Sequence, residues 1–288
     1  MGGPIPVAAT IADVRRAVRS ARAEGKVVGL VPTMGALHDG HGRLIEECRR
    51  EADFVVVSIF VNPAQFGPNE DYRRYPRPLD DDLARSASAG AALAFTPTAG
   101  EMYPTGSLST YVEVPGLSDV LEGASRPGHF RGVATVVLKL FQIVGPDLAT
   151  FGRKDFQQLL VIRRMVADLD VPVRIQAVDT VREADGLALS SRNRYLDPDH
   201  RRAARILSEA LRRARDAVQG GERDANRVRQ ILRSTIESEA VARLDYAEVA
   251  DPETLVPLAE VGPDRPGVAL VAARVGPARL IDNAALPG

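Results

Sequence analysis

Short apolar segments alternate with longer amphipathic segments through the first two-thirds of the chain. Compact apolar runs are typical of buried strands, and apolar positions that recur every three or four residues are typical of helices. We expect strands over Val27–Val31, Phe54–Val61, Ala91–Thr96, Leu148–Phe151 and Val173–Val178. Helices are expected over Gly40–Ala52, Asp80–Gly90, Gly132–Val144 and Asp155–Leu169. This alternation predicts βαβ units around a parallel sheet, which is an α/β fold.

The pattern changes after about Arg182. Two arginine- and alanine-rich helices are expected over Asp199–Gln219 and Arg223–Ala240. Shorter strands follow over Leu244–Val249, Val268–Arg274 and Ala278–Ile281. We therefore predict a larger domain over residues 1–182 and a smaller α+β domain over residues 183–288, joined by a polar hinge.

Composition narrows the class of protein. The formal net charge of −1 gives no strong field for nucleic acid or an anionic membrane, so we expect neither as a partner. The single cysteine, Cys48, excludes an internal disulfide and a cysteine-based metal cluster, and its surroundings predict a packed thiol. With no secretory signal pattern and no long apolar span, a cytoplasmic protein is expected.

The first candidate for chemistry follows the first predicted strand, in the segment PTMGALHDGH. His38 and His41 lie three positions apart, so one helical turn would bring them to the same side. A glycine turn and a helix N-terminus supply free backbone N–H groups, and imidazoles can donate to a phosphorus centre that gains negative charge. A packed histidine pair or two metal ligands remain open as alternatives. The chain lacks both the dinucleotide-binding fingerprint and the GxxxxGK[ST] phosphate loop.

Two further segments offer phosphate-binding groups. Ser190, Ser191 and Arg192 supply two hydroxyls and a guanidinium, although a polar interdomain linker would have the same composition. Lys154 is one of only three lysines against 34 arginines, which suggests a task that arginine does not perform. Asp155 follows it at a predicted helix start, where it could cap the helix or accept hydrogen bonds from ribose hydroxyls.

A fourth segment lies at the end of the strongest predicted strand. Asn62 and Gln65 stand between aromatic residues there, a combination that suits a small substrate with hydroxyls and a carboxylate, or equally a capped loop. The acidic run that contains Asp81 and Asp82 could assist Mg²⁺ or bind an amine. Such a run is also typical of a helix N-terminus.

Taken together, these motifs resemble the pantothenate synthetase (pantoate–β-alanine ligase) family. The matching segments are PTMGALHDGH, SIFVNPAQF, YPR, LEGASRPGHFRGVATVVLKL, FGRKDFQQL and VREADGLALSSRNRYL, followed by VAARVG and RLIDN. The resemblance implies a Rossmann-like parallel sheet with helices on both faces, a smaller C-terminal domain that acts as a lid, and a homodimer. It also implies that pantoate, ATP with Mg²⁺, and β-alanine react through pantoyl adenylate to give pantothenate, AMP and pyrophosphate.

The resemblance assigns roles to residues by matching position. The catalytic set would be His38, His41, Lys154, Ser190, Ser191 and Arg192. The ATP-binding set would be Pro32, Thr33, Met34, His41, Gly152, Lys154, Asp155, Val181, Leu189, Ser190, Ser191 and Arg192. Pantoate would contact Met34, Asn62, Gln65 and Gln158, with Glu122 and His129 on a nearby loop and Asp81 and Asp82 as candidate Mg²⁺ ligands.

The chain departs from the family pattern at two positions. Arg153 stands where glutamate is common, and it adds positive charge beside Lys154. Arg85 stands where some members carry glutamine, which weakens the assignment of Asp81 and Asp82.

Three alternative functions fit the sequence less well. The chain could activate another small acid, but the substrate-side residues Asn62, Gln65 and Gln158 match as well. A catalytically inactive nucleotide-binding regulator should have lost a histidine or Lys154, and both histidines and the lysine are present. A tRNA-binding synthetase fragment is disfavoured by the near-neutral charge.

Overall fold

The computed structural model describes residues 5–68, 70–106 and 108–287. The chain forms two compact units. The first unit comprises the described residues up to Arg153 together with Gln157–Asp179. The second comprises Lys154–Phe156 and the described residues from Thr180 onward.

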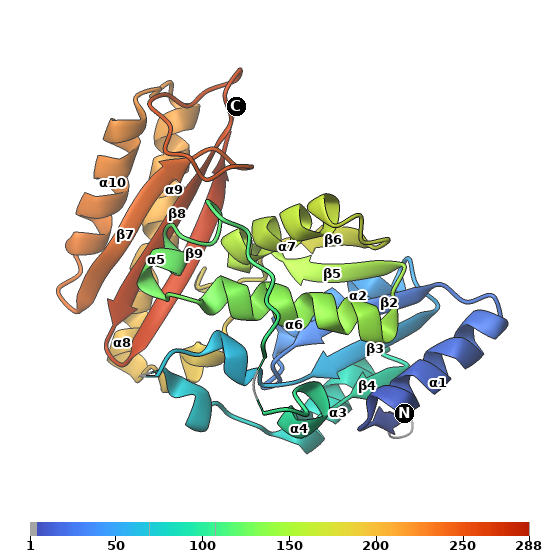
Figure 1. The fold of residues 1–288 in the computed structure, drawn as a ribbon. Coiled ribbons are helices and arrows are strands. Elements are labelled where there is room, and N and C mark those ends of the chain that lie inside the picture. Colours follow the sequence, from blue (N-terminus) through green and yellow to red (C-terminus); the bar gives the residue numbers. More distant parts are fainter. Residues whose placement is uncertain (1–4, 69, 107, 288) are drawn as a thin grey trace. The chain divides into compact units, whose positions relative to one another are not determined.

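A six-stranded parallel sheet forms the centre of the first unit (Figure 1). Its strands are β1 (Val7–Ala8), β2 (Val28–Thr33), β3 (Phe54–Ile59), β4 (Leu93–Phe95), β5 (Leu148–Gly152) and β6 (Arg174–Val178). They lie in the order β1-β4-β3-β2-β5-β6, and every adjacent pair is parallel. The predicted α/β class with a parallel sheet is therefore confirmed.

Helices cover both faces of this sheet. The helices that precede β6 along the chain are α1 (Ile11–Ala23), α2 (Asp39–Arg49), α3 (Leu79–Ser88), α4 (Ala99–Met102), α5 (Glu122–Ser125), α6 (His129–Val144) and α7 (Phe156–Asp168). Helix α6 contacts α1 and β2, whereas α2 contacts α3, β2, β3 and β5 (Figure 1). Strand β1 and helix α1 were not expected from the sequence.

Successive side chains of β2 point to opposite faces of the sheet, so a helix is needed on each face to bury them. Gly29 and Val31 face α2, where Ile45 and Cys48 complete a buried cluster. A Cβ atom at Gly29 would lie 2.4 Å from the Cys48 Sγ atom, so glycine permits the close approach of α2. Cys48 is thus a packed core thiol, and burial raises its pKa to about 12.

The second unit is a three-stranded antiparallel sheet packed against helices. Its strands β7 (Ala242–Ala250), β8 (Gly267–Val275) and β9 (Ala278–Leu286) pair in sequence order. Helices α8 (Pro198–Ala204), α9 (Ile206–Gln219) and α10 (Ala225–Glu237) complete it. The expected helix over Asp199–Gln219 is two helices that meet at Arg205, and the last strand extends beyond the expected Ile281.

The two compact units differ from the expected domain ranges at two short segments. Lys154–Phe156 and Thr180–Arg182 belong to the second unit, whereas the expected ranges put them in the first. Two side chains of β9 account for this difference. Asn283 Nδ2 donates to the Lys154 carbonyl oxygen at 2.9 Å, and Asp282 binds the Arg182 guanidinium. The lid function of the C-terminal domain stays a prediction.

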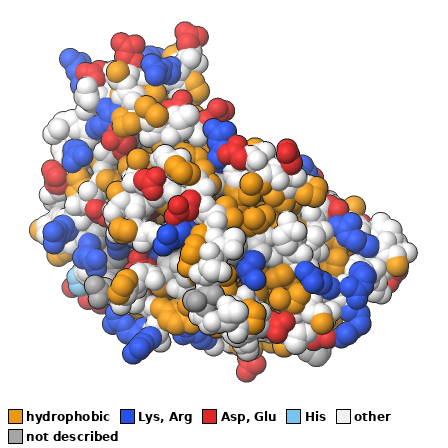
Figure 2. Space-filling view, viewed as in Figure 1, with side chains coloured by type: hydrophobic (Ala, Val, Ile, Leu, Met, Phe, Trp, Pro, Cys, Tyr) orange, Lys and Arg blue, Asp and Glu red, His pale blue; other side chains and the backbone are white. Residues whose placement is uncertain are grey.

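Charge is distributed without a large region of one sign on the face seen in Figure 2, where basic and acidic side chains are interspersed. This mixture agrees with the formal net charge of −1. Among the described residues, none of the helices combines the length and the apolar character required to cross a lipid bilayer.

Candidate active site

A tight turn connects the end of β2 to α2 and carries the first predicted motif. Gly35 adopts φ +83°, and a Cβ there would lie 2.9 Å from Asp82 Oδ2, so this position requires glycine. The Thr33 hydroxyl donates to the Ser58 carbonyl oxygen at 2.8 Å and accepts from the Gly35 N–H at 3.2 Å. The predicted nucleotide residues Pro32 and Thr33 therefore lie in the last two positions of β2.

Asp82 holds this turn from α3. Its carboxylate is 1% exposed and accepts hydrogen bonds from the Ala36 N–H at 2.9 Å and the Leu37 N–H at 2.7 Å. A buried carboxylate needs such donors, and the turn's backbone needs acceptors, so each satisfies the other. Both oxygens of Asp82 thus have a structural task, and Asp81 beside it is exposed.

The two histidines of the motif lie together at the start of α2. Their ring centroids are 4.1 Å apart, and His38 is the N-cap residue of the helix. The His38 backbone N–H donates to His41 Nδ1 at 3.2 Å. Because Nδ1 accepts, the neutral His41 ring carries its proton on Nε2. The structure therefore brings the predicted pair together and gives His41 a defined tautomer, with Nε2–H as a donor.

Backbone groups fix the amide orientation of Asn62 at the end of β3. Asn62 Oδ1 accepts from the Ala64 N–H at 3.2 Å, and Nδ2 donates to the Gly132 carbonyl oxygen at 3.2 Å. The Tyr103 hydroxyl donates to the same Oδ1 at 2.5 Å. Sequence reasoning missed Tyr103, which reaches this cluster from 41 positions away along the chain.

The orientation of Asn62 in turn determines that of Gln65. Asn62 Nδ2 donates to Gln65 Oε1 at 3.1 Å, so the Gln65 Nε2 group must point the other way, where it donates to Met34 Sδ at 3.0 Å. A thioether sulfur is a weak acceptor, so this N–H group can readily be transferred to a stronger acceptor. The structure thus brings together three of the four residues predicted to contact pantoate. The fourth, Gln158, is half-buried on α7.

His129 holds the backbone of the same segment. Arg126 Nη1 lies 3.0 Å from His129 Nε2, and a guanidinium only donates, so Nε2 accepts and Nδ1 donates to the Gln65 carbonyl oxygen at 2.9 Å. Burial, with a smaller effect of the Arg126 charge, lowers the pKa of His129 to about 4. Arg126 also forms two hydrogen bonds of 2.7 Å with Glu70.

The neighbouring Gln157 is a structural tether. Its Nε2 group donates to the carbonyl oxygens of Leu117 and Val120 at 2.7 and 2.8 Å, and its Oε1 atom accepts from the Glu122 N–H at 3.1 Å. This explains how the predicted loop residue Glu122 is held in a buried position.

A cavity of about 280 Å³ opens at the carboxyl ends of β2, β3 and β4. Met34, Gly35 and Phe60 line it together with Tyr72, Arg77 and Thr98. Met34, one of the predicted substrate contacts, therefore borders free space on one side.

In the second unit, the other predicted phosphate-binding segment forms a short 3₁₀ helix over Ser191–Tyr195. Ser190 precedes it as the N-cap, and its Oγ atom accepts from the Arg192 N–H at 3.2 Å. The Leu189 N–H donates to the Val181 carbonyl oxygen at 3.0 Å, which brings two residues predicted to contact ATP side by side.

Lys154 lies between the end of β5 and the start of α7, after Gly152 at the strand's last position. Its Nζ atom is 3.5 Å from Asp155 Oδ1. Arg153, one of the departures from the family pattern, pairs with the exposed Asp179 at 3.0 Å. Arg85, the other departure, pairs with Asp39 at 3.2 Å in an exposed ion pair.

A metal site was predicted at Asp81 and Asp82. In the part of the chain that the structure describes, no three or more histidine, cysteine or acidic side chains gather in an arrangement suited to a metal ion. The assignment of Asp81 and Asp82 to Mg²⁺ stays a prediction.

Comparison with known proteins gives one consistent result. A sequence profile described as pantoate-beta-alanine ligase matches residues 6–285. The pantothenate synthetase of Chloroflexus aurantiacus is 56% identical over 271 residues, which cover 94% of this chain and 95% of that protein. The one from Pelotomaculum thermopropionicum is 52% identical over 277 residues, which cover 96% and 97%.

Solved structures agree with the sequence comparison. The pantothenate synthetase of Thermus thermophilus superposes with a TM-score of 0.93 at 47% identity, covering 99% of this chain and all of that one. The pantoate-beta-alanine ligase of Francisella tularensis, complexed with beta-gamma ATP and β-alanine, has a TM-score of 0.79 at 35% identity. That match covers 98% of this chain and 97% of the other.

Replacement of Asp82 should destabilise the turn before His38. In Asp82→Asn the side-chain NH₂ group would face a backbone N–H, and we expect the free energy of unfolding to fall by about 1–3 kcal/mol. Urea denaturation measures this change. The exposed neighbour provides the control, since Asp81→Asn should change the free energy by less than about 0.5 kcal/mol. Equal effects of the two substitutions would contradict the structural task of Asp82.

The lowered pKa of His129 predicts a dependence of stability on pH. In the unfolded state His129 is protonated below an ordinary histidine pKa of about 6.5, whereas in the folded state it is protonated only below about pH 4. The free energy of unfolding should therefore fall by up to about 3 kcal/mol as the pH drops from 6.5 to 4.

Urea denaturation across this pH range isolates the contribution of His129. The variant His129→Gln should lack this part of the pH dependence, which the wild type should show. Parallel curves for wild type and His129→Gln would refute the interpretation.

Proposed function

This chain belongs to the pantoate-beta-alanine ligase family, and we propose that it joins pantoate to β-alanine in two ATP-dependent steps. It is an enzyme that forms an amide bond. A family profile over residues 6–285 and a relative of known structure in complex with beta-gamma ATP and β-alanine support this proposal.

In the first proposed step, a pantoate carboxylate oxygen attacks the α-phosphorus of ATP. An oxygen–phosphorus bond forms, the bond between the α-phosphorus and its bridging oxygen breaks, and pyrophosphate leaves. In the second step the β-alanine amine attacks the acyl carbon, loses a proton and expels AMP. Both nucleophiles belong to substrates, so the protein's contribution is orientation and stabilisation of developing charge.

The observation that carries the proposal is the histidine pair at the end of β2. The rings of His38 and His41 are 4.1 Å apart, and the tautomer of His41 leaves Nε2–H as a donor. We assign both imidazoles to the reacting phosphates, where hydrogen bonds strengthen as negative charge accumulates.

The second unit supplies the remaining phosphate-binding groups in this proposal. Lys154, Ser190, Ser191 and Arg192 would hold the phosphate chain, because an ammonium, hydroxyls and a guanidinium are its natural donors. Gly152, Asp155, Val181 and Leu189 would contact the ribose and adenine.

Pantoate recognition is assigned to the cluster around Gln65. The Nε2 group of Gln65 is directed away from Asn62 and donates to the weak acceptor Met34 Sδ. A pantoate hydroxyl or carboxylate oxygen is a stronger acceptor and would replace that sulfur. Gln158 would contribute a second amide to the same substrate.

No step is assigned to Mg²⁺ through protein ligands. Both Asp82 oxygens accept backbone N–H groups, so its carboxylate has a structural task, and Asp81 is the exposed member of the predicted pair. A divalent ion would be carried by the ATP phosphates. The homodimer and the cytoplasmic location stay predictions.

The assay that tests the proposal measures AMP release with pantoate and β-alanine supplied together and each omitted in turn. Release should require both acids, and pantoate alone should support exchange of pyrophosphate into ATP. Activity independent of pantoate would indicate another acid substrate. No turnover or exchange with any acid, despite ATP binding, would favour an inactive regulator.

Two substitutions test the assigned phosphate-binding groups. His41→Ala and Lys154→Ala should each lower kcat by about 10²- to 10³-fold, since each removes a donor to the transition state. Circular dichroism should find the fold intact. His200→Ala, at a histidine outside the motif, and Lys26→Ala, at a more exposed lysine, should keep near-normal turnover. A variant at His41 or Lys154 that did the same would remove that residue from the mechanism.

A further inference from the structure

The segment that leads to Ser190 forms a narrow loop within the second unit. Arg182 and Ala188 form an antiparallel bridge, and the Glu183 N–H donates to the Leu187 carbonyl oxygen at 2.8 Å. Gly186 closes the turn with φ +89°. At the base of the loop, Arg182 forms a bidentate ion pair with Asp282 of β9, at 2.6 and 2.9 Å.

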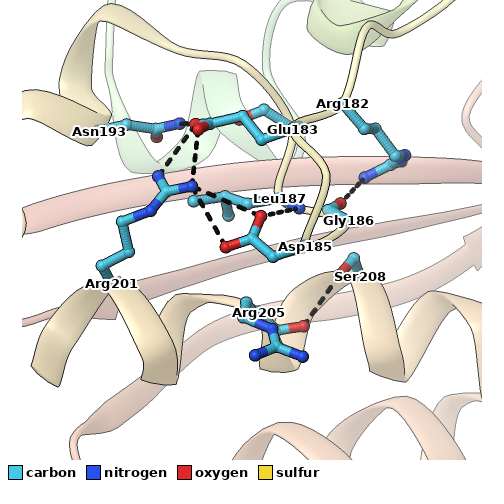
Figure 3. A network of polar contacts seen from close by, with 10 residues as sticks. Arg182, Glu183, Asp185, Gly186, Leu187, Asn193, Arg201, Arg205 and Ser208 are labelled. Carbon is cyan, nitrogen blue, oxygen red and sulfur yellow. Dashed lines mark hydrogen bonds and ion pairs between the residues drawn. The ribbon is translucent and has the colours of Figure 1, made fainter. Parts of the chain in front are cut away.

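Two carboxylates of this loop are bound by one arginine from α8. Arg201 Nη1 and Nη2 donate to the two oxygens of Glu183 at 2.9 and 2.7 Å, and Nη2 also lies 3.2 Å from Asp185 Oδ2 (Figure 3). The planar guanidinium matches the Glu183 carboxylate in the paired geometry that arginine favours. The hydrogen bonds that Arg201 donates to Glu183 raise the pKa of the guanidinium further, so it remains charged.

The same carboxylate is linked to the proposed phosphate-binding segment through Asn193. The Asn193 Nδ2 group donates to Glu183 Oε1 at 3.0 Å (Figure 3). It also donates to the Ala188 carbonyl oxygen at 3.0 Å. The Asn193 N–H donates to the Ser190 carbonyl oxygen at 3.0 Å. Asn193 therefore links Arg201 and Glu183, through its side chain, to Ser190, through its backbone N–H.

Arg201 also neutralises the negative charge of the two carboxylates that it binds. Without Arg201, Glu183 and Asp185 would place two unpaired carboxylates a few residues from groups that must receive an anionic phosphate chain. Like charges at short range raise the free energy of such a complex. The positive charge of Arg201 offsets the charges of Glu183 and Asp185, because its guanidinium binds both carboxylates.

We propose that Arg201 is a positioning residue for ATP: through Glu183 and Asn193 it holds the Ser190–Arg192 segment ready for the phosphates and neutralises the adjacent carboxylates. This inference rests on the proposed function. It adds a residue to which neither the resemblance nor the family match assigned a role.

The test compares Arg201→Gln with the matched control Arg202→Gln. Arg202 is the adjacent arginine of α8, is largely exposed, and pairs with Asp199 three positions before it. Initial rates are measured with ATP varied at saturating pantoate and with pantoate varied at saturating ATP. We expect Arg201→Gln to raise the KM for ATP about tenfold and to change the KM for pantoate less than about twofold. Arg202→Gln should resemble wild type.

A second substitution separates positioning from general stability. In the double variant Arg201→Gln/Glu183→Gln, two amides replace the ion pair and one unpaired carboxylate is removed, so the KM for ATP should recover part of the way. A role in stability alone would predict no such recovery, and would lower the thermal midpoint without altering the ratio of the two KM values. An unchanged KM for ATP in folded Arg201→Gln would overturn the proposal.

Two provisions keep the test decisive. If Arg201→Gln does not fold, Arg201→Lys keeps the charge but not the paired hydrogen bonds, and a wild-type KM for ATP in that variant would equally overturn the proposal. Calorimetric titration of wild type, Arg201→Gln and Arg201→Lys with a non-hydrolysable ATP analogue measures nucleotide binding without turnover. Weakened binding in Arg201→Gln would therefore support the inference even if wild type failed to use pantoate, whereas unchanged binding would contradict it.

Discussion

The parallel pairing of β2 between β3 and β5 is the constraint on which the rest of the first unit depends. Successive connections run from β2 through β3 to β4 in one direction, and from β5 to β6 in the other. The strand order therefore reverses between β2 and β5, and in open α/β sheets ligands bind outside the carboxyl ends of strands at such a point. The turn with His38 and His41 leaves β2 there, and Gly152 ends β5.

Buried polar side chains hold the connections between strands and helices in defined conformations. Asp82 fixes the turn before the histidines, and Asn62 determines which end of the Gln65 amide is presented as a donor. The Arg182–Asp282 pair does the same for the loop of the second unit. Each is a group that would be costly to bury alone, so its partners define a single arrangement.

The sequence predicted the parallel sheet because runs such as Phe54–Ile59 are apolar and short. It also predicted a glycine turn within the segment PTMGALHDGH, which the structure places at Gly35, and the helix that begins near Asp80. Glycine favours turns and clustered carboxylates favour helix N-termini, so both signals are local. Helix α1 was missed because only Val14, Val18 and Ala21 are buried on an otherwise polar, arginine-rich helix. The partners of Asp82 and Tyr103 lie more than 40 positions away, and no local pattern encodes such contacts.

The central claim is that an acyl adenylate links the two substrates, and transfer of an oxygen isotope tests it most directly. Pantoate labelled with ¹⁸O in both carboxylate oxygens is incubated with ATP, β-alanine and the enzyme, and the products are analysed by mass spectrometry. The proposed mechanism predicts one ¹⁸O atom in the phosphate of AMP, one in the amide carbonyl of the product, and none in pyrophosphate. Label in pyrophosphate or inorganic phosphate, or AMP without label, would contradict it.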